Sequence, residues 1–313
     1  MRAARLHTIG GTLQLDEVEV PDAGDGEVLV DMAFASVNPL DIWVTRGAPG
    51  TAADNLPWVP GTEGAGRVDG RPVLIRGAGI GVVRQGLYRE RANVPTSAVM
   101  ALPDGINLAK AAGIGVAGIT AYHCLHTKAQ VAAGDRVLVL GASGGVGAMA
   151  VQLAKLAGAT VWGQTGSEAK AAGIRALGAE HVLVCGPDEL AAQAAEFAPT
   201  VVLDGLSGRF SDAAIAAAAP GGRLVVFGTS ADQQVTLDMR QLYRKGITLY
   251  GYAGLLLPPT ADRDALDALI GMVGDGSLDV PIGAVLGLGG AAEAHARILD
   301  RQVEGKIVLD CNA

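Results

Sequence analysis

Cysteine is scarce in this sequence, and its scarcity excludes a protein held together by disulfides or by structural zinc. The three cysteines, Cys124, Cys185 and Cys311, are too few and too widely spaced for a disulfide framework or a four-thiolate zinc site. Such cysteine use is typical of a reducing compartment, so a cytoplasmic protein is expected. A chain of 313 residues is long enough to bury a hydrophobic core without these cross-links.

An excess of basic charge is also missing, and so are long apolar runs. The 24 lysines and arginines stand against 32 aspartates and glutamates, giving a formal net charge of −8, which argues against general nucleic-acid binding. No stretch reaches the roughly 18 apolar residues of a membrane helix, and the first residues lack the apolar run of a signal peptide. A soluble protein with neither a nucleic-acid nor a membrane partner is expected.

Glycine, by contrast, is abundant, at 45 of 313 residues, about twice its usual share of roughly 7%. The glycines punctuate apolar runs, as expected for tight turns between strands and helices. Short β-like runs fill the first hundred residues. From Ala109 onwards, short apolar runs alternate with amphipathic stretches of about 10–15 residues, which predicts βαβ crossovers and a parallel sheet covered on both faces.

The sequence therefore predicts an α/β protein with two domains. Residues 116–255 form a doubly wound domain, and residues 1–115 form a β-rich domain. The segment 256–313 has too few elements for a core of its own, so it is expected to pack on the β-rich domain and leave a cleft between the two. The apolar run ITLYGYA is expected at the edge of the parallel sheet, where it would pair with a second copy in a homodimer.

A glycine-rich turn after the strand VLVLG predicts a dinucleotide site. Glycines between such a strand and the following helix let a pyrophosphate approach backbone N–H groups at the helix start. Ala142 replaces the first glycine of the usual fingerprint, so the motif alone leaves open a turn in another kind of α/β protein. The surrounding strand and helices favour a cofactor role, in which the candidate residues are Ser143, Gly144, Gly145, Val146 and Gly147.

The end of the second strand in this domain favours NADPH. Thr165 stands where an acid would bind the ribose 2′-hydroxyl and repel a 2′-phosphate. Gly166 follows, and Ser167 and Lys170, near the start of the next helix, can donate to a phosphate. Two alternatives remain, a helix cap for Ser167 and a solvated position for Lys170, and Glu168 is a contrary sign.

Motifs along nearly the whole chain occur in an order typical of one family. They read ASVNPLDIWVTRG, VPGTEGAG, AGITAYHCL, VLVLGASGGVG followed by VQLAK, GAEHVL, LVVFGTS and GKIVL. Together they resemble the zinc-independent quinone oxidoreductase family of the medium-chain dehydrogenase/reductase superfamily. The resemblance implies a groES-like catalytic domain made from both chain ends, a Rossmann domain, and an active site in the cleft between them.

The zinc ligands of related enzymes have no counterpart here. Zinc-dependent relatives carry a cysteine near the first motif and a histidine before the glutamate of the second, whereas SVNPLD lacks cysteine and Thr62 precedes Glu63. His123 and His126 flank Cys124 in a helical segment and are interpreted as surface or core residues rather than metal ligands. No metal is expected, so hydride transfer would have to proceed without a Lewis acid.

The resemblance places Asn38 beside the nicotinamide and the substrate, where its amide could orient either one or stabilise a developing negative charge. Alternatively, Asn38 satisfies the turn before Pro39. Trp43 stands where many relatives have tyrosine. Because an indole N–H is a far poorer acid than a phenol, Trp43 is expected to stack on a flat ring or to lie in the core. Asp41 could organise the loop or act in the chemistry.

Further cofactor residues are implied by the same resemblance. Thr62, Thr120 and Lys306 match positions near the nicotinamide half or the diphosphate, and Gly228 and Thr229 follow a strand whose end faces it. Thr120 could instead serve only its own helix. Cys185, which lies where some NADPH-using relatives have tyrosine, weakens the coenzyme assignment.

These observations predict an NADPH-dependent reductase that transfers a hydride to a quinone or a related conjugated carbonyl. The nearest alternative is an enoyl or alkenal reductase, which would use the same fold and cofactor. A noncatalytic NADPH-binding sensor is the alternative of another class. The segment after Gly70 is shorter than in relatives, which leaves the acceptor open.

Overall fold

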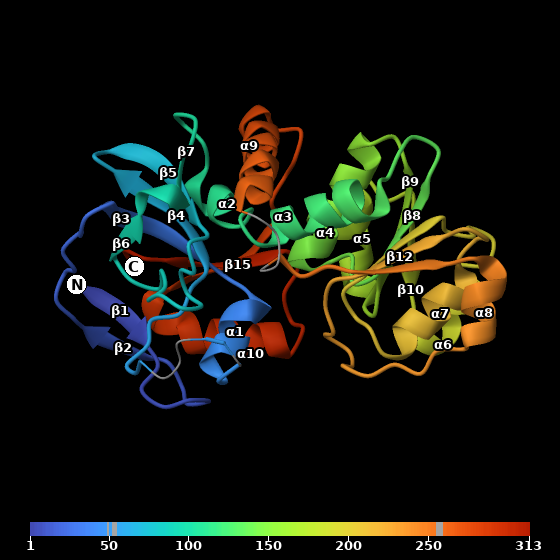
Figure 1. The fold of residues 1–313 in the computed structure, drawn as a ribbon, viewed down its shortest axis with the longest axis horizontal. Coiled ribbons are helices and arrows are strands. Elements are labelled where there is room, and N and C mark those ends of the chain that lie inside the picture. Colours follow the sequence, from blue (N-terminus) through green and yellow to red (C-terminus); the bar gives the residue numbers. More distant parts are fainter. Residues whose placement is uncertain (49, 52–54, 255–258) are drawn as a thin grey trace. The chain divides into compact units, whose positions relative to one another are not determined.

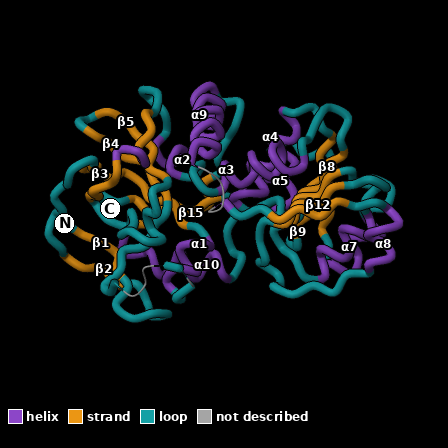
Figure 2. Tube along the Cα trace, viewed as in Figure 1, coloured by secondary structure: helices purple, strands orange, loops and turns teal. Residues whose placement is uncertain are grey.

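The chain folds into one unit rich in antiparallel β-structure and one unit built on a parallel sheet (Figures 1 and 2). The computed structural model describes residues 1–48, 50–51, 55–254 and 259–313. The first unit consists of residues 1–116 with 266–313, and the second of residues 117–265. The sequence places the first boundary at 115/116; its second boundary, at 255/256, lies outside the described residues.

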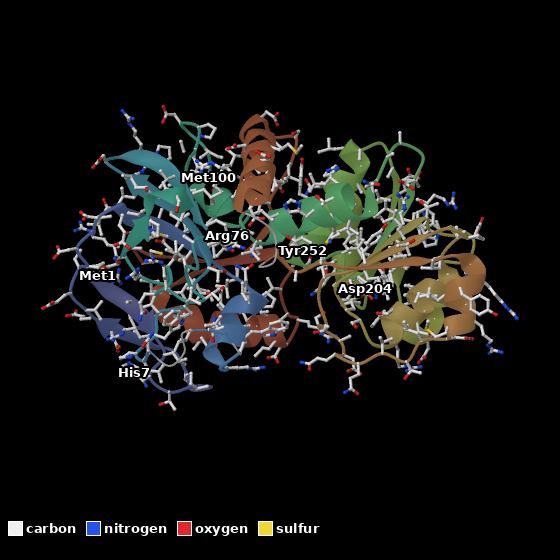
Figure 3. The ribbon with its side chains drawn as sticks, viewed as in Figure 1. Met1, His7, Arg76, Met100, Asp204 and Tyr252 are labelled. Carbon is white, nitrogen blue, oxygen red and sulfur yellow. The ribbon has the colours of Figure 1, made fainter. Side chains whose placement is uncertain are left out.

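The sheet of the first unit is built around β3 (Glu27–Val37), which pairs antiparallel with three strands. These partners are β4 (Glu63–Val68), β6 (Arg91–Pro95) and β15 (Lys306–Asp310). The outer strands are β5 (Arg71–Arg76), β7 (Val99–Ala101) and β14 (Ile282–Gly287), and β1 (Arg2–Arg5) pairs separately with β2 (Gln14–Glu17). Figure 3 labels Arg76 of β5 and Met100 of β7. Because β15 lies beside β3, the last segment of the chain completes a sheet that the first segment begins.

Helices border this sheet, and the most consequential is α1 (Pro39–Thr45), which follows β3 directly. Proline suits its first position because the missing N–H needs no partner there. The others are α2 (Leu108–Ala112), α10 (Ala291–Leu299), and the short 3-10 turns η1 (Thr96–Ala98) and η5 (Leu288–Gly290). A further helix, α9 (Pro259–Asp275), begins in the last residues of the second unit and continues in the first. The sequence interpretation did not anticipate α1, which carries both Asp41 and Trp43.

The second unit contains a six-stranded sheet in the order β10-β9-β8-β11-β12-β13, with every neighbouring pair parallel. Its strands are β8 (Arg136–Val139), β9 (Thr160–Thr165), β10 (His181–Val184), β11 (Val201–Asp204), β12 (Arg223–Val226) and β13 (Thr248–Gly251). The chain winds outwards from β8 to β10 and then returns to β11 on the other side of β8. The carboxyl ends of β8 and β11 therefore form a topological switch point, and β13 lies at the predicted edge.

Helices cover both faces of this sheet. Leu138 and Leu140 share a buried core with α6 (Pro187–Gln193) and α7 (Arg209–Ala217), whereas Val137 points to the opposite face and is also fully buried. The remaining helices are α3 (Ala117–Tyr122), the π-helix η2 (His123–Ala129), α4 (Gly145–Leu156), η3 (Glu168–Lys170), α5 (Ala171–Ala176) and α8 (Met239–Lys245). The predicted α/β class with a doubly wound unit is confirmed, although α8 was not anticipated.

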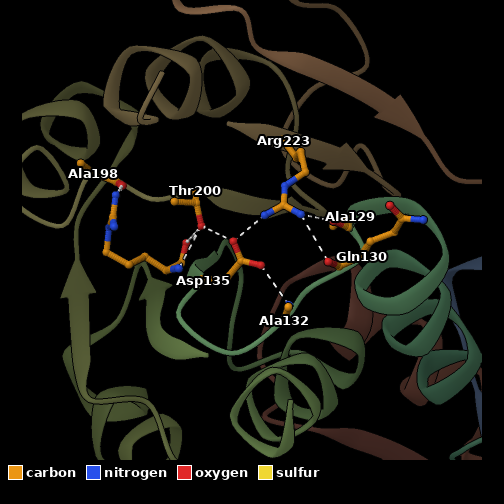
Figure 4. A network of polar contacts seen from close by, with 8 residues as sticks. Ala129, Gln130, Ala132, Asp135, Ala198, Thr200 and Arg223 are labelled. Carbon is orange, nitrogen blue, oxygen red and sulfur yellow. Dashed lines mark hydrogen bonds and ion pairs between the residues drawn. The ribbon is translucent and has the colours of Figure 1, made fainter. Parts of the chain in front are cut away.

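A polar network joins the amino ends of the parallel strands to the π-helix (Figure 4). The Arg223 guanidinium donates to Asp135 Oδ1 at 2.5 Å and to the carbonyl oxygens of Ala129 at 2.5 Å and Gln130 at 3.3 Å. Asp135 also accepts from Thr200 Oγ1 at 2.7 Å. Because helix carboxyl ends leave carbonyl groups without intrahelical partners, Arg223 supplies hydrogen bonds that η2 cannot make for itself.

Replacing Arg223 with alanine is expected to lower the free energy of unfolding by about 2–3 kcal/mol, since charge-assisted hydrogen bonds are lost from a partly buried network. Urea unfolding measures this difference. Arg240→Ala is the matched control, because Arg240 is exposed and its ion pair with Asp238 is worth about 0–1 kcal/mol. Equal effects of the two substitutions would contradict the role given to Arg223.

Candidate functional site

The glycine-rich turn lies at the switch point of the parallel sheet, between β8 and α4. Gly144 is the N-cap residue of α4, whose first residue is Gly145. The Ala142 N–H donates to the Gln164 carbonyl oxygen at 2.9 Å, which ties the turn to the end of β9. Backbone N–H groups at a helix start carry a partial positive charge and bind phosphate groups. The turn therefore has the position and the donors that a pyrophosphate site requires.

Close packing explains the glycines around this turn. A Cβ atom at Gly147 would clash with the Gly141 carbonyl oxygen and lie 2.7 Å from the Ala142 Cα, so only glycine lets α4 start this close to β8. A Cβ at Gly163 of β9 would lie 3.0 Å from the Ala142 Cβ. The methyl group that replaces the first fingerprint glycine is thus accommodated by a glycine on the neighbouring strand.

Gln164 connects three strand ends, and the sequence interpretation missed it. Its side chain is 1% exposed; Oε1 accepts from the Gly141 N–H at 3.1 Å, and Nε2 donates to the Cys185 carbonyl oxygen at 2.8 Å. A buried amide satisfied at both ends fixes its neighbours more firmly than an apolar side chain would. Gln164 therefore holds the turn after β8 against the ends of β9 and β10.

The residues predicted to hold the adenosine end lie at the end of β9 and directly after it. The buried Thr165 accepts from the Ser167 N–H through Oγ1 at 3.3 Å, and Gly166 is exposed. Ser167 is the N-cap residue of η3 but makes no side-chain cap hydrogen bond. Lys170 ends η3 and is half-buried. No acid stands at the end of β9, and the only one in η3 is Glu168, which is exposed.

Asp204, labelled in Figure 3, shapes the other side of the switch point and was also missed. It ends β11 and is fully buried; Oδ1 accepts from the N–H groups of Leu206 at 2.9 Å and Ser207 at 2.8 Å, and Oδ2 from Ser211 Oγ at 2.5 Å. These bonds commit the carboxylate to holding the loop after β11. Asp204 is therefore a structural residue of this edge.

The other predicted cofactor residues of this unit occupy two places. Gly228 and Thr229 follow β12 at the same carboxyl edge, and a Cβ at Gly228 would lie 3.0 Å from the Gly205 carbonyl oxygen. Thr120 lies half-buried on α3, which packs on α4. The second unit thus gathers the turn after β8 and the segments after β9 and β12 along one edge.

The first unit contains the other predicted residues, and Asn38 is at the centre of a buried polar group. Its Nδ2 donates to Glu63 Oε1 at 2.8 Å, and its Oδ1 accepts from Lys306 Nζ at 2.5 Å. Lys306 is also 3.1 Å from Glu63 Oε1, and all three side chains are at most 4% exposed. Asn38 therefore does more than satisfy a turn before Pro39.

Asp41 organises the loop around Asn38. Its carboxylate accepts from the N–H groups of Asn38 at 2.8 Å and Thr62 at 3.0 Å, and from Tyr88 Oη at 2.9 Å. Burial raises the pKa of Asp41 to about 6, an effect that these hydrogen bonds partly offset. Burial and the neighbouring Asp41 carboxylate raise the pKa of Tyr88 well above its usual value. These three bonds show that Asp41 organises the loop.

Thr62 and Trp43 occupy contrasting positions beside this loop. Thr62 is fully buried, and within the described part of the chain no protein group hydrogen-bonds its Oγ1. Trp43, on α1, is 53% exposed, which excludes the core position considered for it. An exposed indole face is available for stacking on a flat ring.

The described residues contain neither a cluster of metal ligands nor a helix that could span a membrane. Over residues 1–48, 50–51, 55–254 and 259–313, no group of three or more histidine, cysteine, aspartate or glutamate side chains could hold a metal ion. His123 Nδ1 lies 2.9 Å from Thr127 Oγ1, and its Nε2 lies 3.7 Å from Asp262 Oδ1. Within the same residues, no helix is long and apolar enough to cross a membrane.

Two glycine substitutions test the geometry of the turn. Gly147→Ala is expected to destabilise the protein by about 1–3 kcal/mol, because the turn must move, and to abolish tight nucleotide binding. Gly144→Ala is expected to keep the stability, because its Cβ would lie 3.5 Å from the nearest backbone oxygen, while weakening binding where a phosphate would approach. Thermal unfolding and nucleotide fluorescence titration measure both effects. Unchanged binding in both variants would disprove this position for the pyrophosphate.

Two family models match the chain, one in each unit. The alcohol dehydrogenase GroES-like domain matches residues 24–104, and the zinc-binding dehydrogenase model matches residues 145–271. A curated quinone oxidoreductase of Sus scrofa is 30% identical and is covered over 97% of its length by 99% of this chain. A probable acrylyl-CoA reductase of Escherichia coli, AcuI, is 27% identical, with 97% of this chain and 96% of the relative covered.

Other relatives are much longer. The chain spans about 15% of the length of a mycocerosic acid synthase-like polyketide synthase of Mycobacterium tuberculosis, to which 96% of it aligns at 29% identity. Among solved structures, the quinone oxidoreductase of Thermus thermophilus, also solved in complex with NADPH, is 31% identical with a TM-score of 0.87, covering 99% of this chain and 100% of that one. An NAD-dependent alcohol dehydrogenase reaches the same TM-score at 29% identity, with 99% of each chain covered.

These matches confirm the family and the fold that the motifs indicate. The β-rich unit is GroES-like and the parallel unit is a Rossmann domain, the arrangement of oxidoreductases that use a nicotinamide cofactor. On sequence, fold and the geometry of the turn together, the chain belongs to the quinone oxidoreductase family of the medium-chain dehydrogenase/reductase superfamily.

Proposed function

We propose that the protein is an NADPH-dependent reductase that transfers a hydride to a quinone or a related conjugated carbonyl. The observation that carries this proposal is the carboxyl edge of the parallel sheet, where the start of α4 and a strand end without an acid lie together. The turn fits a pyrophosphate, because the N-cap residue Gly144 has no side chain to keep a phosphate away from the first N–H groups of α4. When bound, the nicotinamide cofactor supplies the hydride.

The segment after β9 supports the phosphorylated coenzyme. Thr165 offers no negative charge to repel a 2′-phosphate, and the Ser167 hydroxyl is not used as a helix cap. Lys170 adds positive charge at the start of the same helical segment. An ammonium and a hydroxyl within one short segment suit a dianionic phosphate better than a neutral ribose hydroxyl. These residues would hold the adenosine end of NADPH.

The first unit supplies groups for the acceptor side of the reaction. A carbonyl oxygen that receives electrons becomes negative, and hydrogen-bond donors aimed at it lower the barrier. Asn38 carries such donors in a buried, water-excluding setting, where hydrogen bonds are strong. The exposed ring of Trp43 offers a flat surface against which a planar acceptor can stack.

An enoyl or alkenal reductase is the second candidate, and one comparison favours it. The probable acrylyl-CoA reductase of Escherichia coli is named for an activated alkene joined to a thioester. Hydride delivery to a β-carbon would use the same cofactor edge. Product analysis with a naphthoquinone and with a 2-enoyl thioester separates the two candidates. A protein that binds NADPH tightly and reduces neither would be a sensor.

The experiment that tests the proposal follows NADPH consumption with a simple naphthoquinone in the presence of a metal chelator. Turnover is expected to persist with the chelator. In Lys170→Glu the KM for NADPH is expected to rise about 10- to 100-fold, because an attractive charge next to the phosphate becomes repulsive. The KM for NADH is expected to change much less.

Arg175→Glu is the matched control, since Arg175 is an exposed basic residue farther along the same segment, on α5. It reverses the same charge and is expected to leave the KM for NADPH within about threefold of the unmodified protein. Equal effects of the two substitutions, or a lower KM for NADH than for NADPH, would refute the coenzyme assignment. Failure across a broad panel of quinones and enones would refute the reductase.

The proposal includes a homodimer formed through β13. This strand pairs with β12 on one side only, and Leu249 within it is 44% exposed, as suits an edge that a second copy covers. Sedimentation is expected to show a dimer for the unmodified protein and a monomer for Leu249→Lys. Leu156→Lys, at the exposed end of α4, is the control expected to stay dimeric. A monomeric unmodified protein would contradict this assembly.

A further inference from the structure

The side-chain amide of Asn38 lies between a group that only donates hydrogen bonds and a group that only accepts them. The Lys306 ammonium lies 2.5 Å from Oδ1, and the Glu63 carboxylate accepts from Nδ2 at 2.8 Å. A reversed amide would turn its N–H groups towards the ammonium and its oxygen towards the carboxylate. Both contacts would then be repulsive. Lys306 and Glu63 therefore fix the orientation of the Asn38 amide, with Oδ1 towards the ammonium and Nδ2 towards the carboxylate.

The Lys306 ammonium donates its hydrogen bonds to acceptors within the first unit. An ammonium group has three N–H donors, and Nζ contacts three acceptors, namely Asn38 Oδ1, Glu63 Oε1 at 3.1 Å and the Val37 carbonyl oxygen at 3.4 Å. Its side chain is only 4% exposed. With every donor directed to a neighbour in the same unit, Lys306 is placed to act on Asn38.

Glu63 is held just as firmly. Its Oε1 accepts from Asn38 and Lys306, and its Oε2 accepts from the Val116 N–H at 2.7 Å. A Cβ at Gly115 would lie 2.9 Å from Oε2, so the Glu63 carboxylate can occupy this position only because residue 115 has no side chain. Glu63 itself is fully buried. Donors on both oxygens prevent the carboxylate from rotating away from Asn38.

From this geometry we infer that Glu63 and Lys306 are positioning residues that make Asn38 a hydrogen-bond donor towards its ligand. Glu63 uses one N–H of Nδ2, which leaves the second for a ligand, while Lys306 occupies the amide oxygen and draws electron density from it. The group that Asn38 binds is then an acceptor, such as a carbonyl oxygen of the substrate or of the nicotinamide carboxamide. This inference rests on the proposed function and narrows it.

A double-mutant cycle tests whether Glu63 acts through Asn38. Glu63→Gln replaces one acceptor oxygen with an NH2 group that must face a donor, so the amide of Asn38 is misplaced. The expected kcat is about 10- to 100-fold lower, with the KM for NADPH changed by less than about threefold. Asn38→Ala is expected to lower kcat by a similar factor. In the Asn38→Ala background, Glu63→Gln should change kcat no further, since the group it positions is already gone.

Lys306→Met gives a second, independent arm, since it removes the donor to Oδ1 while keeping a long side chain. It too should have little effect on kcat once Asn38 is alanine. Asn93→Leu is the control for loss of a hydrogen bond in the same unit, because Asn93 Nδ2 donates to Glu27 Oε2 at 3.0 Å, at the opposite end of β3 from Asn38. Its effect on kcat, whatever its size, should multiply with that of Asn38→Ala. If the effect of Glu63→Gln on kcat also multiplied with that of Asn38→Ala, the Glu63–Lys306 pair would have only a structural role, and the inference would be wrong.

A readout without turnover separates this inference from the proposed function. Nitrogen-15 NMR of the ligand-free protein should show an Asn38 side-chain N–H displaced downfield and protected from exchange, identified by its loss in Asn38→Ala. Both features should vanish in Glu63→Gln and stay in Asn93→Leu. If the Asn38 amide signal did not change in Glu63→Gln and Lys306→Met, the positioning role of Glu63 and Lys306 would be disproved. If the signals behave as expected while no acceptor is reduced, only the proposed function fails.

Discussion

The start of α4 lies so close to the turn after β8 that residue 147 has no room for a side chain. This contact holds the first N–H groups of α4 at the carboxyl edge of the parallel sheet, beside the switch point. The helix then presents its partial positive charge where phosphate groups would lie. Gln164 and Asp204 hydrogen-bond the backbone at the neighbouring strand ends. The proposed nucleotide site therefore depends on the absence of a side chain at Gly147 as well as on the N–H groups at the start of α4.

The first unit uses buried charge for a comparable purpose. Asp41 gathers two backbone N–H groups and the Tyr88 hydroxyl, and it thereby fixes the loop that carries Asn38. Glu63 and Lys306 then compensate each other's charge while contacting the same amide. Removing one partner of a buried pair is costly, which keeps such a network intact once formed. The unit thus holds one small amide in a single orientation without exposing it to water.

Much of this fold could be predicted from local sequence patterns. Strands and helices of the parallel unit follow from apolar runs that alternate with amphipathic stretches, since each strand is buried on both faces. Two short helices, α1 and α8, could not be predicted from such patterns. Residues 39–45 of α1 follow an apolar strand without a break in hydrophobicity, and α8 has no buried residue to give it an apolar stripe. Tertiary packing rather than local pattern determines such segments.

The site was predictable only in part, for a similar reason. The glycine turn lies within one continuous motif, and so does Thr165 at the end of β9. Both could therefore be recognised from a short stretch of sequence. Glu63 and Lys306 lie 25 and 268 positions from Asn38, and no spacing in the sequence announces that they meet. An acid between glycines in GTEGAG was the one available clue to Glu63, because a charged residue in a buried strand needs a partner.

The most direct measurement is calorimetric binding of two coenzyme fragments that differ only in the 2′-phosphate, adenosine 2′,5′-bisphosphate and AMP, to the unmodified protein. The fragments lack the nicotinamide, so they report on the carboxyl edge of the parallel sheet alone. The account predicts that the 2′-phosphorylated fragment binds at least about tenfold more tightly, which corresponds to about 1.4 kcal/mol. Equal or tighter binding of AMP would contradict it.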